Sequence, residues 1–377
     1  MKKILYVTGT RADFGLMEKT LKAIDNSEDF NLGIVVTGSH FGEEGNHSFE
    51  CVLSSGLKIL AEIRPNAPQS QLDSWLSMGS DLMSGLKVVF RSFKPDLVIV
   101  LGDRFEMLVT ALSAVSCLIP VVHIHGGELS GTLDESFRHA ISKLANIHLV
   151  STAASGERLI RMGENKSSVF IVGAPGLEGI EAIESAEDDD LREIGLDPKR
   201  NFSVIIFHPV VQRHLEAKNQ VRLVYDVSRV ATDQLLIIAP NDDLGAQEIL
   251  GFWEEIALTA QDNVVIKRHI DRQFFLSILK RAELLLGNSS MGIIESASLN
   301  LPTINFGSRQ AYRERNLNCW DTNFDTNDAF KCIKKALQSK SSDWSNVYYQ
   351  PNSSSLILKI LMELDWSLLN LEKCNAY

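Results

Sequence analysis

The sequence of 377 residues lacks the features on which disulfide-rich, zinc-binding and membrane-spanning proteins depend. Its five cysteines are an odd number, are widely scattered and include no CxxC pair, so neither a disulfide framework nor a zinc site of usual spacing is predicted. Reduced thiols, and therefore a cytoplasmic location, are the simplest account. No apolar stretch approaches the roughly 18 residues that a membrane span needs. The apolar run near the N-terminus stops at Gly9, which is too short for a signal peptide.

Excess positive charge is also missing. The formal net charge is -11, so no sequence-wide basic field is available for nucleic acid or an anionic membrane. An anionic ligand would have to be bound by local groups, such as helix N-termini and single arginines. The GxGxxG fingerprint is absent from the turn after the first predicted strand, which weighs against NAD as a cofactor.

The chain does contain two consecutive series of short apolar runs, separated by segments of helical length and period. The strands predicted in the first series are Lys3–Val7, Asn31–Val36, Leu57–Ile63, Leu97–Leu101, Pro120–Ile124, Ile147–Val150 and Phe170–Val172. Those of the second series are Phe202–Phe207, Leu235–Ile238, Val264–Ile266, Leu284–Leu286 and Thr303–Phe306. The chain is too long for a single core, so the pattern predicts an α/β protein with two doubly wound domains facing a cleft.

Candidate catalytic side chains are concentrated after two neighbouring strands of the first series. Those after the first of the two strands are Asp103, Arg104 and Glu106, and those after the second are His125, Glu128, Asp134 and Glu135. Loops that leave the carboxyl ends of adjacent parallel strands share one rim of the sheet, where ligands bind. A row of acids and histidines on that rim indicates proton-transfer chemistry. Asp103 has a second interpretation, as the cap of a helix that begins near Phe105, and the two roles are compatible.

Three other histidines are interpreted as structural. His123 and His148 lie within apolar strands, and a histidine in such a place is more often a satisfied core residue than a ligand; His139 is interpreted in the same way. A metal-dependent hydrolase that used His123 and His125 as ligands is an alternative. It predicts further histidines at ligand spacing downstream, and no HxxH or later His pair is present.

A second set of candidates runs from a strand into a predicted helix at residues 286–295. Ser289 and Ser290 offer hydroxyls beside the free amides of a helix N-terminus, which together form an anion trap. Glu295, about one turn further, could accept two hydroxyl hydrogen bonds, such as those of a ribose. The alternative is an N-cap serine with an ordinary first-turn glutamate. Arg309, after the next strand, adds a positive charge, and together the two segments favour a diphosphate site.

Seven short motifs, taken in order, carry a resemblance to a known family. They are Gly9–Asp13, Gly102–Glu106, His123–Glu128, Ser136–His139, Phe207–Pro209, Gly287–Ser290 and Gly307–Gln310. In this order they resemble the UDP-N-acetylglucosamine 2-epimerase family, specifically its hydrolysing branch from sialic-acid and legionaminic-acid-type sugar biosynthesis. The resemblance covers nearly the whole chain.

The resemblance implies a GT-B fold, in which two Rossmann-like domains lie on either side of a cleft. The N-terminal domain would span residues 1–175 and be completed by a C-terminal helix at 355–377, and the UDP-binding domain would span 176–354. The implied reaction eliminates UDP from UDP-N-acetylglucosamine to give a glycal-like intermediate, which water converts to free N-acetylmannosamine. No redox cofactor or essential metal is implied, and the protein would be a homodimer or homotetramer.

The resemblance also implies roles for individual residues. Asp103 and Asp134 correspond to the acid/base carboxylates and Arg104 to a ligand-binding arginine. The UDP-binding residues would be Arg11 and His208 for the phosphates, Asn241 as a polar contact, Ser289 and Ser290 as the diphosphate cradle, Glu295 for the ribose, and Arg309 for a phosphate or the sugar.

The sequence departs from the family pattern at one important position. Where several members have HIEGGE, with a catalytic glutamate, this chain has His125. The group that moves the C2 proton is therefore left open between the imidazole of His125, Glu128 and Asp134. The substrate is open as well, because HIHGGE also resembles enzymes that act on a UDP-2,4-diacetamido-2,4,6-trideoxy sugar. A GT-B glycosyltransferase, which needs an acceptor, is a further alternative.

Overall fold

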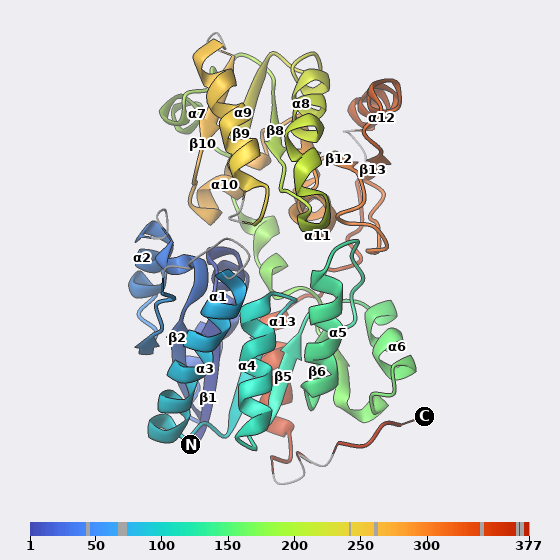
Figure 1. Ribbon diagram of the computed structural model, residues 1–377. Helices are drawn as coiled ribbons and strands as arrows, with labels where there is room; N and C mark the ends of the chain where they lie inside the picture. The colour runs from blue at the N-terminus through green and yellow to red at the C-terminus, as the bar shows by residue number, and fades with distance from the viewer. Residues whose placement is uncertain are drawn as a thin grey trace. The chain divides into compact units, whose positions relative to one another are not determined.

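The computed structural model describes residues 1–42, 46–66, 74–240, 243–259, 263–339, 343–366, 369 and 373–376. These residues form two compact units (Figure 1). Unit 1 comprises residues 1–128, 134–178 and 348–377, and unit 2 comprises residues 129–133 and 179–347. The chain thus leaves unit 1 for only five residues, Leu129–Leu133, before it returns at Asp134.

Unit 1 is built on a sheet of seven parallel strands in the order β3-β2-β1-β4-β5-β6-β7. The strands are β1 (Lys2–Thr8), β2 (Phe30–Val36), β3 (Ile59–Glu62), β4 (Leu97–Leu101), β5 (Val121–Ile124), β6 (Ile147–Val150) and β7 (Val169–Ile171). The helices are α1 (Arg11–Asp25), α2 (Asn46–Ser54), α3 (Ser74–Phe93), α4 (Phe105–Ser116), α5 (Asp134–Leu144), α6 (Ala153–Arg161) and α13 (Ser353–Glu363). The strand order reverses between β1 and β4, which is where open α/β sheets bind ligands.

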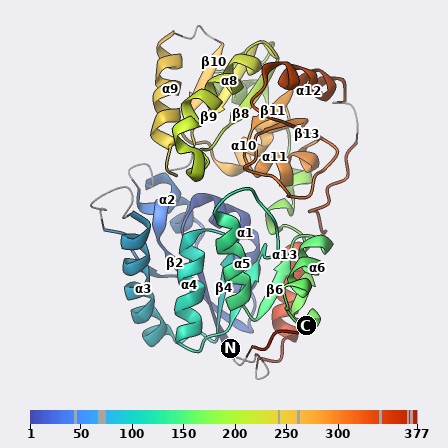
Figure 2. The same cartoon turned by 45° about the vertical axis from the view of Figure 1, so that its right-hand side comes forward.

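Both faces of this sheet are buried, which explains why its strands read as continuous apolar runs. Ile4 and Tyr6 of β1 point into a core shared with α1 and α13, whereas Leu5 and Val7 point into a core shared with α3 and α4. Two views of the molecule show α4 and α5 on one face of the sheet and α13 on the other (Figures 1 and 2).

Helix α13 joins unit 1 although it lies at the far end of the sequence. It packs against α1, with Ile357 and Leu361 buried in the same core as Met17. The two helices are also joined by a hydrogen bond of 2.9 Å between the hydroxyls of Thr20 and Ser354. The first helix of the unit, α1, is therefore covered by α13, the last helix that the structure describes.

Unit 2 has a second parallel sheet, of six strands in the order β10-β9-β8-β11-β12-β13. The strands are β8 (Phe202–Ile206), β9 (Gln234–Ile238), β10 (Val264–Lys267), β11 (Leu284–Gly287), β12 (Thr303–Phe306) and β13 (Cys319–Thr322). The helices are α7 (Asp188–Ile194), α8 (Ala217–Ser228), α9 (Ala246–Thr259), α10 (Arg272–Leu279), α11 (Met291–Ile294) and α12 (Thr326–Gln338). Its strand order reverses between β8 and β11. The predicted class, two doubly wound α/β domains, is confirmed.

Two differences from the sequence prediction concern single elements. Strand β13 was not predicted, because its sequence, Cys-Trp-Asp-Thr, is not an apolar run. The sequence predicts a helix from Leu16 to about Ile24, whereas helix α1 begins at Arg11, because Thr10 caps it in a capping box with Asp13. Within the described parts of the chain, no helix is both long enough and apolar enough to cross a membrane.

Candidate active site

The acids and histidines predicted for unit 1 lie at the carboxyl ends of adjacent strands β4 and β5. Asp103 follows β4 and precedes α4, whose N-cap is Arg104 rather than Asp103. The alternative role of Asp103 as the cap of this helix is therefore wrong. His125 follows β5 directly, and Asp134 is the first residue of α5.

Asp103 is held by an arginine that the sequence analysis did not select. The guanidinium of Arg138, one turn into α5 and 1% exposed, forms an ion pair with the Asp103 carboxylate. Arg138 also donates a hydrogen bond of 3.1 Å to the carbonyl oxygen of Glu128. A planar guanidinium that contacts two groups fixes their relative positions. Arg138 thus connects the loop after β4 to the loop after β5.

His125 and Glu128 form a buried pair. The Nδ1 atom of His125 lies 2.8 Å from the Oε1 atom of Glu128, and the same oxygen accepts a 2.6 Å hydrogen bond from the hydroxyl of Ser151. The three residues are 7%, 3% and 2% exposed, so these contacts are shielded from water. Such a pair between imidazole and carboxylate sets the tautomer and orientation of the ring.

The turn that carries His125 is fixed by its backbone. His125 has φ +63°, a left-handed conformation that is unusual for a residue other than glycine, and its amide donates to the carbonyl of Leu149 at 3.0 Å. Gly127 has φ +75°, and a Cβ there would meet the carbonyl oxygen of Ser155 at 2.3 Å. A Cβ on Gly126 would meet the His123 ring at 2.8 Å. Only glycine fits at both positions, so the ring of His125 is presented by a tightly packed turn.

His123 is a core residue, as predicted. It is fully buried, its Nδ1 atom lies 3.0 Å from the Ser142 hydroxyl, and its Nε2 atom lies 2.7 Å from the Gly102 carbonyl oxygen. Burial lowers the pKa of this histidine to about 3, so the ring is neutral. Strand β5 ends at Ile124, so His125 lies outside the strand. Strand alternation therefore does not place the rings of His123 and His125 on one face, as the metal-ligand alternative requires. In the described part of the chain, no cluster of three or more His, Cys, Asp or Glu could hold a metal ion.

Another buried acid, Asp13, lies in the first turn of α1, shortly after β1. Asp13 accepts hydrogen bonds of 3.0 Å from the amides of Gly9 and Thr10 and one from the hydroxyl of Thr8, whose oxygen also lies 2.8 Å from Nε2 of His40. Burial raises the pKa of Asp13 to about 6. The sequence shows Asp13 only as the last residue of the motif Gly9–Asp13. The structure shows that it shapes the turn that precedes Arg11, the first residue of α1.

The remaining predicted residues of unit 1 lie on the same rim. Arg104 is half-buried, with its Nε atom 3.4 Å from Oε2 of Glu106, a carboxylate that is only 2% exposed. Phe105, close to Asp103 in sequence, stacks on Trp75, and Phe137, next to Arg138, meets Trp75 edge-on; all three ring centroids lie 5.7 Å apart. This aromatic cluster packs together the N-terminal ends of α3, α4 and α5, next to the charged groups.

In unit 2, the predicted residues converge on Asn288, which the sequence analysis did not select. The Oδ1 atom of Asn288 accepts a 2.8 Å hydrogen bond from the His208 amide, and its Nδ2 atom donates a 2.8 Å hydrogen bond to the His208 carbonyl. The backbone carbonyl of Asn288 accepts hydrogen bonds from Arg309 at 3.2 Å and from Gln310 at 3.0 Å. Asn288 is 1% exposed. It therefore fixes the loops that carry His208 and Arg309 against each other.

Ser289, Ser290 and Glu295 lie at the predicted strand-to-helix turn, but the helix is short. Helix α11 contains only four residues, with Ser290 as its N-cap, so its dipole is weaker than that of the helix expected from the sequence. Glu295 lies one turn after the start, as predicted, but the α-helix ends there. Its carboxylate is buried and forms an ion pair with Arg272. Asn241 lies outside the described residues.

Arg309 is joined to the five-residue segment Leu129–Leu133. The carbonyl of Arg309 accepts a 3.3 Å hydrogen bond from the amide of Gly131, and a Cβ on Gly131 would meet the carbonyl oxygen of Ser308 at 1.8 Å. Only glycine permits this approach. The chain between Glu128 and Asp134 is therefore bound to the loop that carries Arg309.

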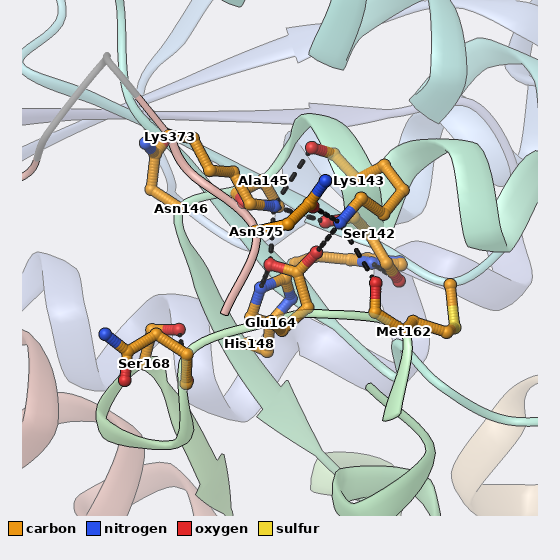
Figure 3. A network of polar contacts seen from close by, with 12 residues as sticks. Ser142, Lys143, Ala145, Asn146, His148, Met162, Glu164, Ser168, Lys373 and Asn375 are labelled. Carbon is orange, nitrogen blue, oxygen red and sulfur yellow. Dashed lines mark hydrogen bonds and ion pairs between the residues drawn. The ribbon is translucent and has the colours of Figure 1, made fainter. Parts of the chain in front are cut away.

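A separate buried network lies at the other end of α5 and supports the structure of unit 1 (Figure 3). Glu164 is fully buried, with Lys143 at 2.7 Å, Lys373 at 2.6 Å and His148 at 2.8 Å. Burial lowers the pKa of His148. Burial alone would raise the pKa of Glu164, but the hydrogen bonds from His148, Lys143 and Lys373 outweigh it and hold this pKa at about 2. His148 is thus structural, as predicted.

The comparisons with known proteins cover nearly the whole chain. The family described as UDP-N-acetylglucosamine 2-epimerase matches residues 22–362. The chain is 39% identical over 379 residues to the UDP-N,N'-diacetylbacillosamine 2-epimerase (hydrolyzing) of Legionella pneumophila, with 100% of each chain covered. It is 33% identical over 341 residues to the UDP-N-acetylglucosamine 2-epimerase of Neisseria meningitidis serogroup B, with 89% of this chain and 88% of the other covered.

Solved structures support the same fold. The UDP-GlcNAc 2-epimerase of Neisseria meningitidis bound to UDP-GlcNAc has a TM-score of 0.78 at 18% identity, with 96% of this chain and 100% of the other covered. The Methanocaldococcus jannaschii UDP-GlcNAc 2-epimerase in complex with UDP-GlcNAc and UDP has a TM-score of 0.79 at 19% identity, with 96% and 99% covered. The GT-B fold that the resemblance implied is confirmed.

Proposed function

Because the chain belongs to the UDP-N-acetylglucosamine 2-epimerase family, we propose that it is a hydrolysing 2-epimerase. It would release UDP and a free, 2-epimerised sugar from a UDP-2-acetamido sugar. The observation that carries this proposal is the cluster of Asp103, His125, Glu128 and Arg138 on the rim of unit 1, whose contacts are described above.

The chemistry requires proton transfer at a carbon that is only weakly acidic. The proton leaves C2 while the bond between C1 and the UDP oxygen breaks, so a base and groups that stabilise the leaving diphosphate must act together. Asp103 and Asp134 are proposed as acid/base carboxylates of unit 1, with Arg11 and Arg104 as ligand-binding cations. His208, Ser289, Ser290, Glu295 and Arg309 are proposed to bind UDP in unit 2, with Asn241 as a further contact.

Glu295 has a binding partner already, which supports its proposed role. Its ion pair with Arg272 holds the carboxylate at the end of α11, in one orientation. A carboxylate fixed in this way can accept hydrogen bonds from a pair of vicinal hydroxyls without first losing rotamer freedom. Ribose presents such a pair.

The sugar is proposed to be a 2,4-diacetamido-2,4,6-trideoxy hexose. The Legionella pneumophila relative, which matches over the full length of both chains, is named for a UDP-diacetylbacillosamine substrate and as hydrolysing. UDP-N-acetylglucosamine, giving N-acetylmannosamine, is the second candidate, because the Neisseria meningitidis relative is named for that substrate. Either product would serve the synthesis of a sialic-acid-type sugar for a capsule or lipopolysaccharide, in the cytoplasm.

The test is a proton NMR time course in deuterated water with each nucleotide sugar in turn and no added metal. We expect free sugar that carries deuterium at C2, together with UDP, and faster turnover of the diacetamido substrate. A nucleotide-bound product epimerised at C2 would show that the enzyme is not hydrolysing. Release of UDP only after an acceptor is added would identify a glycosyltransferase instead.

A further inference from the structure

We propose that His125 is the base that removes the C2 proton, through Nε2, and that Glu128 and Ser151 are positioning residues for it. This inference rests on the proposed function. The sequence leaves this step open between His125, Glu128 and Asp134, and the contacts of the imidazole favour the first.

The two nitrogens of His125 are in different environments. Nδ1 lies 2.8 Å from the Glu128 carboxylate, so this nitrogen carries the hydrogen and donates it. Nε2 then has a free lone pair, on the edge of the ring that points away from Glu128. It is buried and has no hydrogen-bond partner among the residues that the structure describes. A buried acceptor without a partner costs free energy, so its retention at this rim indicates a ligand contact.

Glu128 is less suited to act as the base. Its Oε1 atom already accepts from both His125 and Ser151, and the side chain is 3% exposed. Each donated hydrogen bond stabilises the carboxylate and lowers its tendency to take a proton. The same carboxylate stabilises the imidazolium that forms when His125 takes a proton, as a positioning acid does in catalytic triads.

The step is balanced as follows. Nε2 of His125 takes the proton from C2, the electrons of the C2–H bond form the C1–C2 double bond, and the C1–O bond breaks with its electrons leaving on UDP. Water then adds its hydroxyl to C1, while a second group delivers a proton to C2. This proton arrives on the face opposite to His125, because epimerisation inverts C2. The proton of water restores that second group, and the proton held by His125 passes to solvent. Asp103 and Asp134 are the proposed candidates for the second group.

The decisive variant is His125→Asn. Its amide nitrogen takes the place of Nδ1 and can still donate to Glu128, and asparagine tolerates the positive φ of this position, but the variant has no Nε2. If His125 is the base, turnover falls by about 10²- to 10⁴-fold, while UDP affinity measured by calorimetry is unchanged. Turnover within about tenfold of the parent would overturn the proposal.

A matched control is His139→Asn, on α5, where the ring is partly exposed and lies 3.7 Å from Glu135. We expect its turnover to match that of the parent. The parent enzyme is measured beside the variants in the same NMR assay. If the parent releases no UDP from either nucleotide sugar, the proposed function fails; if the parent is active and His125→Asn is active too, only this inference fails.

The positioning role of Glu128 is tested by Glu128→Gln, through the pH profile of kcat/KM. Other groups around the His125 turn are His123 on β5, Arg138 on α5, and Arg158 on α6, which donates to the carbonyl of Gly127. All of them remain in the variant. Loss of the carboxylate destabilises the imidazolium, so the midpoint of the acidic limb moves to lower pH. An unchanged midpoint would leave Glu128 a purely structural residue, and an inactive Glu128→Gln beside an active His125→Asn would make Glu128 the base.

Discussion

Asn288 and His208 hold each other by two hydrogen bonds of 2.8 Å, in which the side-chain amide of Asn288 both accepts from and donates to the backbone of His208. The two residues follow β11 and β8, the central strands at which the order of the unit 2 sheet reverses. The backbone of the proposed phosphate-binding histidine is thus fixed by a residue that makes no proposed contact with UDP itself.

Replacement of Asn288 by alanine should therefore weaken UDP binding. The variant leaves the amide and carbonyl of His208 without these partners, so we expect UDP affinity to fall about 10- to 100-fold, equivalent to the loss of about 1 to 3 kcal/mol. Calorimetric titration with UDP measures this. Asn165→Ala, which removes the cap of a short helix in unit 1, is the control that should leave UDP affinity unchanged. Equal affinity in both variants would contradict the positioning role.

Replacement of either proposed acid/base carboxylate should reduce turnover without reducing UDP affinity. Asp103→Asn and Asp134→Asn are expected to abolish measurable turnover, because an amide cannot transfer the proton, while UDP affinity is largely preserved. Asp103→Asn also leaves Arg138 without its ion-pair partner, so thermal unfolding is measured in parallel. Turnover retained in a stably folded variant would remove that aspartate from the mechanism.

Replacement of a proposed diphosphate contact should instead reduce UDP affinity. Arg309→Ala removes a cation that donates to the Asn288 carbonyl at 3.2 Å, and Ser290→Ala removes a hydroxyl at the start of α11. Each variant should weaken UDP binding by about tenfold, and the effect of Arg309→Ala should be smaller at high salt. A variant with unchanged UDP affinity but slower turnover would not belong to the diphosphate site.

The network around Glu164 predicts an effect on stability. Lys373 donates to Glu164 and to the carbonyl oxygens of Ser142, Lys143 and Ala145 at 3.0, 2.9 and 2.7 Å, so it caps the C-terminal end of α5. Lys373→Met should lower the free energy of unfolding by about 2 kcal/mol. Lys359→Met, at an exposed pair with Glu363 on α13, should change it by less than about 1 kcal/mol. Urea unfolding distinguishes the two, and equal effects would contradict the assignment.

Stability should fall with pH below about 6.5. Burial lowers the pKa values of His40 to about 4 and of His123 to about 3, and it lowers that of His148, from an ordinary value of 6.5. The unfolded chain then binds up to three protons that the folded chain does not, and stability is lost as pH falls through this range.

Asp13 opposes this trend, because its pKa rises from 3.8 to about 6 and the folded chain takes up its proton first. Between pH 6 and 5, the two protons of His40 and His123 against the one of Asp13 predict a loss of about 1.4 kcal/mol per pH unit, and the lowered pKa of His148 adds to this loss. Urea unfolding at several pH values measures the slope. Constant or rising stability between pH 6.5 and 5 would show that the three buried histidines do not control it.

The sequence predicts the strands well where apolar runs are buried on both faces. Leu97–Leu101 and Thr303–Phe306 coincide with β4 and β12. Strand β13 was not predicted from the sequence because it pairs only with β12, at the edge of the sheet, and such a strand needs no continuous apolar run. The start of α1 was readable in principle, since Thr10 and Asp13 have the spacing of a capping box.

The site was harder to predict than the fold. Sequence order places Asp103 and His125 on one rim because parallel strands end together. It does not show that Arg138 pairs with Asp103, or that Ser151 shares an oxygen of Glu128, since those contacts depend on how loops from different strands pack. An arginine at an apolar-facing position of α5 was the available signal for Arg138, because a buried guanidinium requires a partner.

The packing of α1 against α13 has a consequence for synthesis on the ribosome. Thr20 and Ser354, which bond to each other, are 334 positions apart. At about 5 to 20 residues per second, translation separates them by roughly 20 to 70 seconds. Throughout that interval the apolar side of α1 is exposed without its partner helix. Chaperones that shield nascent chains should therefore be needed most by this N-terminal region. Unit 1, whose synthesis starts first, should complete its folding last.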